Sequence, residues 1–356
     1  MICEKEVLSF DDVLMVPQFS KIVSRSEVDT SVIANLVHNN YEKTFNFKIP
    51  IISSPMSTIS EDKMCNALGE KGGFGIIHRY NTIDKQVFLL SKVENKNVKA
   101  AAIGVGGDYK ERLDELYKND LQIVCIDVAH GDHFLVKEAI EYIKSKYPKL
   151  FIIAGNIATA HAYRRLSEWG AHAVRTSVGS GSICTTRIQT GHGMPTFQAI
   201  IDCDNHKCEM VQDEITPALL IADGGMKNSG DIAKALAAGA DFVMLGSMLS
   251  GTSEAPGKII EKNGKKYKEY NGMASKKAQK DWKGSYSSIE GVSSFVEYKG
   301  HVKPVIDELM QGLKSAMSYS GSRDLREFRE DVIFVKQTHS SHIEGTSHIF
   351  NKGKSL

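Results

Sequence analysis

The chain has 356 residues, a hydrophobic content of 42% and a formal net charge of +1. This length fits one large α/β barrel or two average domains. A net charge near zero lacks the basic excess of a nucleic-acid-binding protein. The longest apolar runs, such as 218–222, and shorter ones such as 242–245 are too short to cross a bilayer. We therefore expect a globular protein that binds neither nucleic acid nor a membrane.

The first residues and the cysteines indicate the compartment. Residues 1–6 lack the apolar stretch of a signal peptide. The six cysteines show no disulfide-like spacing, which favours a reducing compartment and a cytoplasmic location. Cys203, Cys208 and His206 lie close together in sequence, but without a second ligand pair of matching spacing they predict no zinc site.

Short apolar runs alternate with amphipathic stretches along most of the chain. The apolar runs predict strands at 49–53, 73–78, 100–105, 123–128, 151–156, 171–177, 218–223 and 242–246. Between them, helical patterns cover 61–70, 82–93, 109–118, 134–147, 159–169, 195–203 and 230–238. Uniformly apolar strands are typical of a parallel sheet that is covered by helices.

These alternating units predict an α/β fold, a (β/α)₈ TIM barrel over residues 49–249. An open, doubly wound sheet is the alternative, but it rarely needs eight consecutive strand–helix units. Glycine and polar residues follow each predicted strand, as at Ser53-Ser54, His78-Arg79, Gly155-Asn156 and Asp223-Gly224. Active sites of barrels lie on these loops, so this asymmetry also favours an enzyme.

The last third of the chain departs from the repeat, although we expect 1–356 to form a single domain. Residues 252–300 are polar and rich in lysine, which predicts a flap at the active face, with a small hairpin around Asn263-Gly264. A helix over 305–313 belongs to a C-terminal segment of residues 301–356. Three histidines at 339, 342 and 348 lie in a tail that we expect to be mobile or packed on a neighbouring subunit, not to bind metal.

Residues 177–187 carry the strongest functional signal. This glycine-rich turn ends in Cys184, followed by two threonines and Arg187. Glycines let a ligand approach the main chain closely, and electropositive, partly exposed surroundings favour the reactive thiolate. A buried structural cysteine is the alternative, but the sequence around Cys184 favours a nucleophile.

Two further glycine turns follow the seventh and eighth predicted strands. They are Asp223-Gly224-Gly225 and Gly246-Ser247, at the place where barrels bind phosphate through backbone N–H groups. An aspartate beside such a cradle can accept hydrogen bonds from ribose hydroxyls. The pair of turns therefore predicts a nucleotide ligand.

Taken together, these motifs resemble those of the family of IMP dehydrogenases and GMP reductases. The resemblance runs nearly end to end, through residues 8–14, 53–56, 126–127, 154–156, 179–187, 221–225, 272–273 and 298–300. It implies a barrel that binds a purine nucleoside monophosphate, a cysteine that attacks C2 of the base, and a nicotinamide cofactor that handles the hydride. Family members are commonly homotetramers, which we expect here too.

The resemblance also implies roles for individual residues. Cys184 is the nucleophile, with Thr186 and Glu290 as a proton relay. The substrate-binding residues are Ser54, Met56, Asp223, Gly224, Gly225, Gly246, Ser247, Tyr270, Gly272 and Met273. Asp127, Ala129 and Gly179 lie toward the cofactor, and backbone carbonyls of Gly179, Gly181 and Cys184 would bind a potassium ion.

Three departures from the family pattern bear on the reaction. The regulatory CBS domain pair is missing, because His78 runs directly into the next helix. Arg175-Thr176-Ser177 replaces the usual hydrophobic-glycine pattern before the cysteine loop. The flap stretch 282–290 has a tyrosine but no arginine before it, whereas dehydrogenases use an Arg-Tyr pair to activate water.

The first and third departures favour a GMP reductase that uses NADPH. The alternative is an IMP dehydrogenase that uses NAD, toward which the tail and the segment 235–239 point. A purine-nucleotide-binding protein without turnover is the third possibility, although the retention of Cys184, Thr186 and Glu290 together speaks against it.

Overall fold

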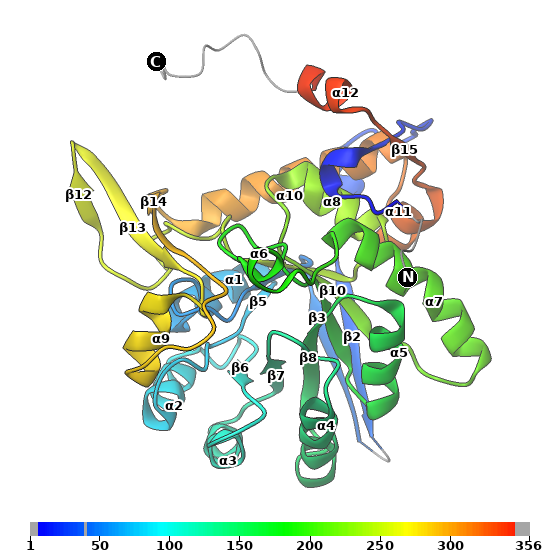
Figure 1. The fold of residues 1–356 in the computed structure, drawn as a ribbon. Helices are drawn as coiled ribbons and strands as arrows, with labels where there is room; N and C mark the ends of the chain where they lie inside the picture. Colours follow the sequence, from blue (N-terminus) through cyan, green and yellow to red (C-terminus); the bar gives the residue numbers. More distant parts are fainter. Residues whose placement is uncertain (1–5, 39–40, 346–356) are drawn as a thin grey trace.

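Eight parallel strands form the centre of the fold, which confirms the predicted barrel (Figure 1). The computed structural model describes residues 6–38 and 41–345. The barrel strands are β4 (Ile51–Ser53), β5 (Phe74–Gly75), β6 (Ala100–Ile103), β7 (Ile123–Asp127), β8 (Phe151–Ile157), β9 (Ala173–Thr176), β10 (Leu219–Asp223) and β11 (Phe242–Leu245). Each lies within or against a predicted strand.

The ring closes between β5 and β6. The strands are ordered β5-β4-β11-β10-β9-β8-β7-β6, and Ile77, just beyond β5, forms a parallel bridge to Ala101. The Ile77 amide donates to the Ala100 carbonyl at 2.9 Å, and the Ala102 amide donates to the Ile77 carbonyl at 2.8 Å. The open-sheet alternative is therefore excluded.

The outer helices follow the predicted order. They are α1 (Asp62–Lys71), α2 (Ile83–Ser91), α3 (Tyr109–Lys118), α4 (Phe134–Lys146), α5 (Ala160–Trp169), α7 (Thr196–Gln212) and α8 (Ser229–Ala237). Side chains of Thr82, Thr159 and Asn228 cap α2, α5 and α8 by accepting backbone N–H bonds. Helix α7 is longer than the predicted 195–203, because its polar second half continues helically to Gln212.

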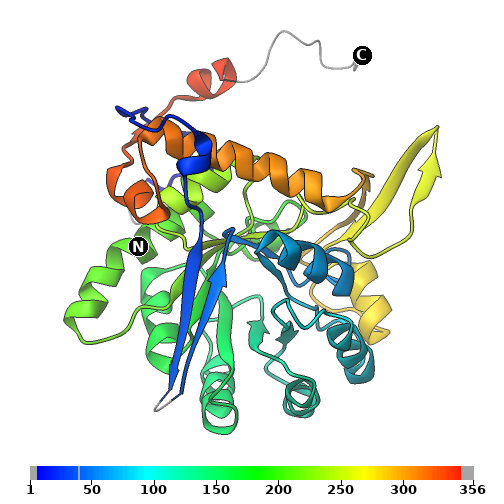
Figure 2. The same cartoon turned by 180° about the vertical axis from the view of Figure 1, so that it is seen from behind.

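A hairpin that the sequence analysis did not predict covers the amino-terminal end of the barrel (blue in Figure 2). It consists of β2 (Val32–His38) and β3 (Tyr41–Phe47). Phe47 contacts Phe74 and Phe242, with ring centroids 4.7 and 5.4 Å away, and Phe45 contacts Phe151 at 5.8 Å. These three partners begin β5, β11 and β8, so the hairpin leaves only the carboxyl-terminal end of the barrel open.

Residues 252–300 contain the predicted hairpin and two unpredicted elements. Strands β12 (Ile260–Lys262) and β13 (Lys265–Asn271) join through Asn263 and Gly264, which both have positive φ, of 53° and 71°. Strand β14 (Ser293–Glu297) completes an antiparallel sheet, and helix α9 (Lys276–Lys283) lies between β13 and β14 in sequence. Figure 1 shows the hairpin extending away from the barrel.

The C-terminal segment packs on the start of the same chain. Helix α10 (Val302–Ser320) contains the predicted helix and is followed by α11 (Leu325–Asp331), β15 (Phe334–Lys336) and α12 (His339–Glu344). Strand β15 pairs with β1 (Val13–Met15). His348 lies outside the described residues. Within the described part of the chain, no three His, Cys, Asp or Glu side chains are grouped to hold a metal ion.

The described residues also contain no helix that is both long and apolar enough to span a membrane. Cys203 is buried, and its Sγ lies 3.8 Å from Thr176 Oγ1 of strand β9.

The aromatic contacts beneath the barrel lead to a stability prediction. Replacing the buried Phe47 with Ala removes its contacts with Phe74 and Phe242 and should lower the free energy of unfolding by about 3–5 kcal/mol. Phe19→Ala is the matched control, because Phe19 is 85% exposed and should change stability by less than about 0.5 kcal/mol. Equilibrium urea unfolding followed by circular dichroism measures both. Equal stabilities for the two variants would contradict the role of the hairpin.

Candidate active site

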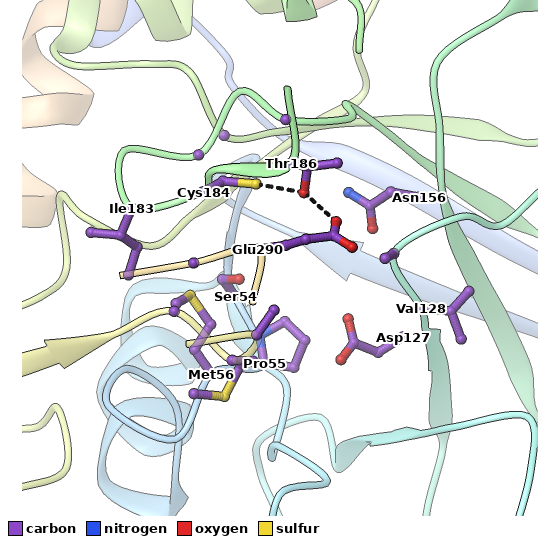
Figure 3. A pocket seen from close by; sticks show the side chains of 18 of the residues that line it. Ser54, Pro55, Met56, Asp127, Val128, Asn156, Ile183, Cys184, Thr186 and Glu290 are labelled. Carbon is purple, nitrogen blue, oxygen red and sulfur yellow. Dashed lines mark hydrogen bonds between the residues drawn. The ribbon is translucent and has the colours of Figure 1, made fainter. Parts of the chain in front are cut away.

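The carboxyl-terminal ends of the barrel strands surround a cavity of about 430 Å³, shown in Figure 3. A second cavity of about 160 Å³ adjoins it and shares part of its wall, including Ser54, Asp223 and Tyr270. The larger cavity is lined by Ser54, Met56, Asp127, Ala129, Gly179, Gly181, Cys184, Thr186, Asp223, Gly224, Tyr270, Gly272, Met273 and Glu290. The smaller one adds Gly225, Gly246 and Ser247. The structure thus brings every predicted site residue to one place.

Cys184, Thr186 and Glu290 form a row of hydrogen-bonded side chains (Figure 3). Cys184 Sγ lies 3.1 Å from Thr186 Oγ1, which donates to Glu290 Oε2 at 2.9 Å. The other oxygen of Glu290 accepts from Ser288 Oγ at 3.1 Å. Both carboxylate oxygens are therefore oriented, and a proton can pass between the carboxylate and the cavity through Thr186.

Cys184 differs in accessibility from three other cysteines. Its side chain is partly exposed and lines the cavity. Cys65, Cys125 and Cys203 are buried, and burial raises the pKa of each to about 12. Those three thiols stay protonated and out of reach of solutes, which makes Cys184 the best placed nucleophile among them.

Backbone hydrogen bonds join the cysteine loop to the flap. Cys184 forms an antiparallel bridge with Gly291, and the Thr185 amide donates to the Glu290 carbonyl at 2.9 Å. The Val292 amide donates to the Ile183 carbonyl at 3.0 Å. These bonds place Glu290 beside the thiol, although 104 residues separate it from Thr186 in sequence.

Arg187 holds the other side of the cysteine loop. Its guanidinium donates to Ser180 Oγ at 2.6 Å and to the Met194 carbonyl at 2.5 Å. Gly179 has a φ of 79°, and a Cβ at this position would lie 2.5 Å from Arg187 Cγ. The glycine is therefore required both for its backbone conformation and for the close approach of the arginine.

The two glycine turns form the wall of the smaller cavity. Gly224 and Gly225 have positive φ, and a Cβ on Gly224 would lie 3.5 Å from the Cα of Gly181, so the Asp223 turn and the cysteine loop are in contact. A Cβ on Gly246 would lie 3.1 Å from Tyr270 Oη. This small cavity, bounded by glycine backbone and hydroxyl groups, suits a phosphate.

Arg175, which the sequence analysis noted only as a departure, lies beneath the larger cavity and is 4% exposed. Its Nη1 donates to Asp127 Oδ1 at 2.7 Å, and its Nη2 donates to Asp223 Oδ2 at 2.8 Å. Burial lowers the pKa of Arg175, but the carboxylates of Asp223 and Asp127 outweigh it and raise the pKa. Burial likewise raises the pKa of Asp127, but Arg175 and Arg79 outweigh that effect and lower it.

Three further residues form a wall to which the sequence analysis assigned no role, although it placed one of them, Arg79, on an active-face loop. The Arg79 guanidinium lies over the rings of Tyr80 and Trp282, at 4.8 and 5.6 Å from their centroids. The two rings contact each other edge to face at 5.3 Å. Arg79 follows a predicted strand, as an active-site residue of a barrel should, but Trp282 comes from α9 and only the fold brings it here.

Comparisons with known proteins agree with this geometry. The model of the IMP dehydrogenase / GMP reductase domain matches residues 7–348. A GMP reductase of Lactobacillus delbrueckii subsp. bulgaricus is 36% identical over 338 residues, which are 94% of this chain and 96% of that protein. An inosine-5'-monophosphate dehydrogenase of Borreliella burgdorferi is 34% identical over an alignment 412 positions long, gaps included, which covers 97% of each chain.

A solved structure gives the same result. The crystal structure of a cysteine-to-alanine variant of Trypanosoma brucei GMP reductase in complex with guanosine 5'-monophosphate superposes with a TM-score of 0.87, at 27% sequence identity, and covers 98% of both chains. The fold, the near-complete sequence matches and the grouping of the predicted site residues lead to one conclusion: the chain belongs to the IMP dehydrogenase / GMP reductase family and is an oxidoreductase of purine nucleotides.

Proposed function

We propose that the chain is a GMP reductase, which converts GMP, with NADPH, to IMP and ammonia. The observation that carries this proposal is the row from Cys184 through Thr186 to Glu290, in which a carboxylate is hydrogen-bonded to a hydroxyl beside the thiol. Expulsion of ammonia needs a proton at the leaving nitrogen, and this row can deliver one. The similar GMP reductases and the similar structure with bound GMP support the same choice.

In this proposal, the nucleotide lies across both cavities. The turns at Gly224-Gly225 and Gly246-Ser247 bind its phosphate, and Asp223 binds the ribose. These contacts hold C2 of the base near Cys184. Glu290 first accepts the proton of the Cys184 thiol through Thr186, and the thiolate attacks C2. The C2–N bond then breaks as the same proton returns through Thr186 to the amine, which leaves as ammonia. The resulting thioimidate is then reduced at C2, and the thiolate leaves as IMP forms.

The cofactor fits the rest of the larger cavity. Asp127 and Ala129 line it beyond the thiol, and Tyr80 and Trp282 offer aromatic surfaces beside the Arg79 cation. A planar nicotinamide and a ribose match this combination of rings and carboxylate. NADPH would supply the hydride that reduces the thioimidate, and Asp127, Tyr80 and Trp282 would hold it on this side of the cavity.

The second candidate is an IMP dehydrogenase that uses NAD, because one relative of 34% identity has that name. Its water-hydrolysis step needs a base on the flap. Among the described residues of 279–291, those that line the cavity include no arginine. Tyr286 is exposed outside the cavity wall and packs against Lys276 and Lys280, at 4.7 and 5.5 Å from its ring centroid. This arrangement favours the reductase.

The third candidate, a nucleotide-binding protein without turnover, receives no support from the site. A binding protein needs the phosphate cradle and Asp223, but it does not need the oriented carboxylate of Glu290 beside an accessible thiol. The potassium ion at the carbonyls of Gly179, Gly181 and Cys184, the homotetramer and the cytoplasmic location stay predictions.

The choice between reductase and dehydrogenase is directly measurable. In an assay with GMP and NADPH, the absorbance at 340 nm should fall as NADPH is oxidised. The amount of ammonia released should equal the amount of NADPH consumed. IMP with NAD should give at most a slow covalent adduct, because loss of a general base typically costs about 10²–10⁴-fold in rate. Steady XMP formation at ordinary enzymatic rates would make the dehydrogenase the answer, and Lys283 or Tyr286 would then be tested first as the base.

The nucleophile can be tested by substitution. Cys184→Ala should abolish turnover while the dissociation constant of GMP stays within about tenfold, since phosphate and ribose contacts remain. Cys203→Ala is the control and should keep turnover, because Cys203 is buried away from the cavity. An electrophilic purine-nucleotide analogue, followed by mass spectrometry, should label Cys184. Labelling at Cys125 or Cys203 instead would contradict the assignment.

The proton relay predicts a separation between rate and binding. Glu290→Gln keeps the shape of the side chain but cannot carry the proton, so kcat for GMP should fall by about 10²–10⁴-fold with GMP affinity almost unchanged. Glu297→Gln is the matched control, because Glu297 is an exposed flap residue paired with Lys265. If Glu290→Gln kept the wild-type kcat, the relay would be wrong.

A further inference from the structure

A buried cation joins the two halves of the site. Arg175 contacts Asp223 on one side and Asp127 on the other. We propose that Arg175 is a positioning residue that couples nucleotide binding at Asp223 to cofactor binding at Asp127, so that each ligand strengthens the binding of the other. This inference rests on the proposed function, which places the nucleotide ribose at Asp223 and the cofactor near Asp127.

At Asp223, one carboxylate oxygen accepts all the hydrogen bonds from Arg175 and Asn156. Asp223 Oδ2 accepts from Arg175 Nη2 at 2.8 Å, from Arg175 Nε at 3.2 Å and from Asn156 Nδ2 at 2.7 Å. Asn156 is itself held by the Ser177 carbonyl at 3.1 Å. The second oxygen receives none of these bonds and is the one that can accept from ribose hydroxyls. Its direction is therefore set by Arg175 and Asn156.

The Asp127 end is engaged on both oxygens. Asp127 Oδ1 accepts from Arg175 at 2.7 Å, and Oδ2 accepts from the Tyr80 hydroxyl at 3.1 Å. Arg79 Nε donates to the Asp127 carbonyl at 3.1 Å and lies 3.4 Å from Oδ2. Arg79 in turn lies over Tyr80 and Trp282, so the link continues to the aromatic wall of the cofactor side.

Charges therefore alternate across the floor of the cavity, from Arg79 to Asp127, Arg175 and Asp223. These side chains are hydrogen-bonded to one another without a ligand, and a ligand that binds Asp223 limits the movement that remains to its carboxylate, to Arg175 and through Arg175 to Asp127. Ordering of these side chains costs conformational entropy once, with the first ligand, and the second ligand then binds to a group that is already ordered. The expected coupling is positive, and by linkage it is equal in both directions.

A purely structural ion pair is the competing explanation. Buried ion pairs contribute little to stability compared with well-packed apolar residues, and the strands beside β9 already supply an apolar core. Arg175 lies where the core ends and the cavity begins, since it lines that cavity. Its position fits an orienting group at the ligand boundary better than a core contact.

The test measures binding of GMP and of NADP⁺, separately and together, by isothermal titration calorimetry. Every arm carries Cys184→Ala, which prevents loss of ammonia from GMP, and NADP⁺ has no hydride to transfer, so the ternary complex is stable. Here "wild-type" refers to residue 175. In the wild-type protein, saturating NADP⁺ should lower the dissociation constant of GMP by at least about fivefold, and saturating GMP should lower that of NADP⁺ by the same factor. In Arg175→Met this factor should fall toward one, and in Arg175→Lys it should be intermediate.

Arg329→Lys is the matched control. Arg329 pairs with the buried Asp241 at 2.8 Å, at the opposite end of the barrel, so this variant should keep the full coupling factor. If Arg175→Met does not fold, two other variants replace it. Arg175→Lys changes the central cation, and Asp127→Asn removes the charge of its partner on the cofactor side. Both should reduce the coupling factor measurably below that of the wild-type protein.

The outcomes separate the two proposals. Wild-type protein that binds neither GMP nor NADP⁺ overturns the proposed function and this inference with it. Wild-type protein that binds both ligands without coupling, or variants at Arg175 that keep the wild-type factor, overturn the inference alone. A structural role for Arg175 would lower the melting temperature without changing the ratio of the dissociation constants.

Discussion

Parallel strands closed into a ring have all their carboxyl ends on one rim, and every functional feature of this chain depends on that constraint. The bridge between Ile77 and Ala101 closes the ring, and the β2–β3 hairpin covers its other end. Loops that are distant in sequence must then share a small area. Contact between the Gly224 turn and Gly181 of the cysteine loop is a direct result, and it brings the loop that carries Cys184 against the smaller cavity.

The barrel alone does not complete the site, because the carboxylate beside the thiol comes from the insertion after β11. Backbone contacts hold the flap against the cysteine loop. They are the bridge between Cys184 and Gly291 and the hydrogen bond from the Thr185 amide to the Glu290 carbonyl. The side chains of Thr186 and Glu290 meet because their backbones are already paired. The site is thus built by two levels of pairing, parallel within the barrel and antiparallel above it.

Much of this organisation could be predicted from sequence, for identifiable reasons. Short, uniformly apolar runs that alternate with amphipathic helical patterns are typical of a parallel sheet covered by helices, so the barrel strands could be predicted. The β2–β3 hairpin was missed because Ile33 and Val37 are apolar yet exposed, which obscures the alternation of Val32, Ala34 and Leu36. The role of Arg175 was also beyond sequence analysis. Its partners lie 48 residues away on either side, and only the strand order brings them within hydrogen-bond distance.

The attachment of Glu290 to the flap has a consequence for the resting enzyme. The flap carries the carboxylate, whereas the barrel rim carries Cys184 and Thr186. Any displacement of the flap that breaks the Thr185–Glu290 bond would therefore also separate Glu290, the proton carrier of the proposed mechanism, from the thiol. An open site then holds a cysteine without its acid–base partner. Under the proposed mechanism, bond cleavage on the purine requires the flap to be docked, so a flap that undocks to exchange ligands would also turn the chemistry off.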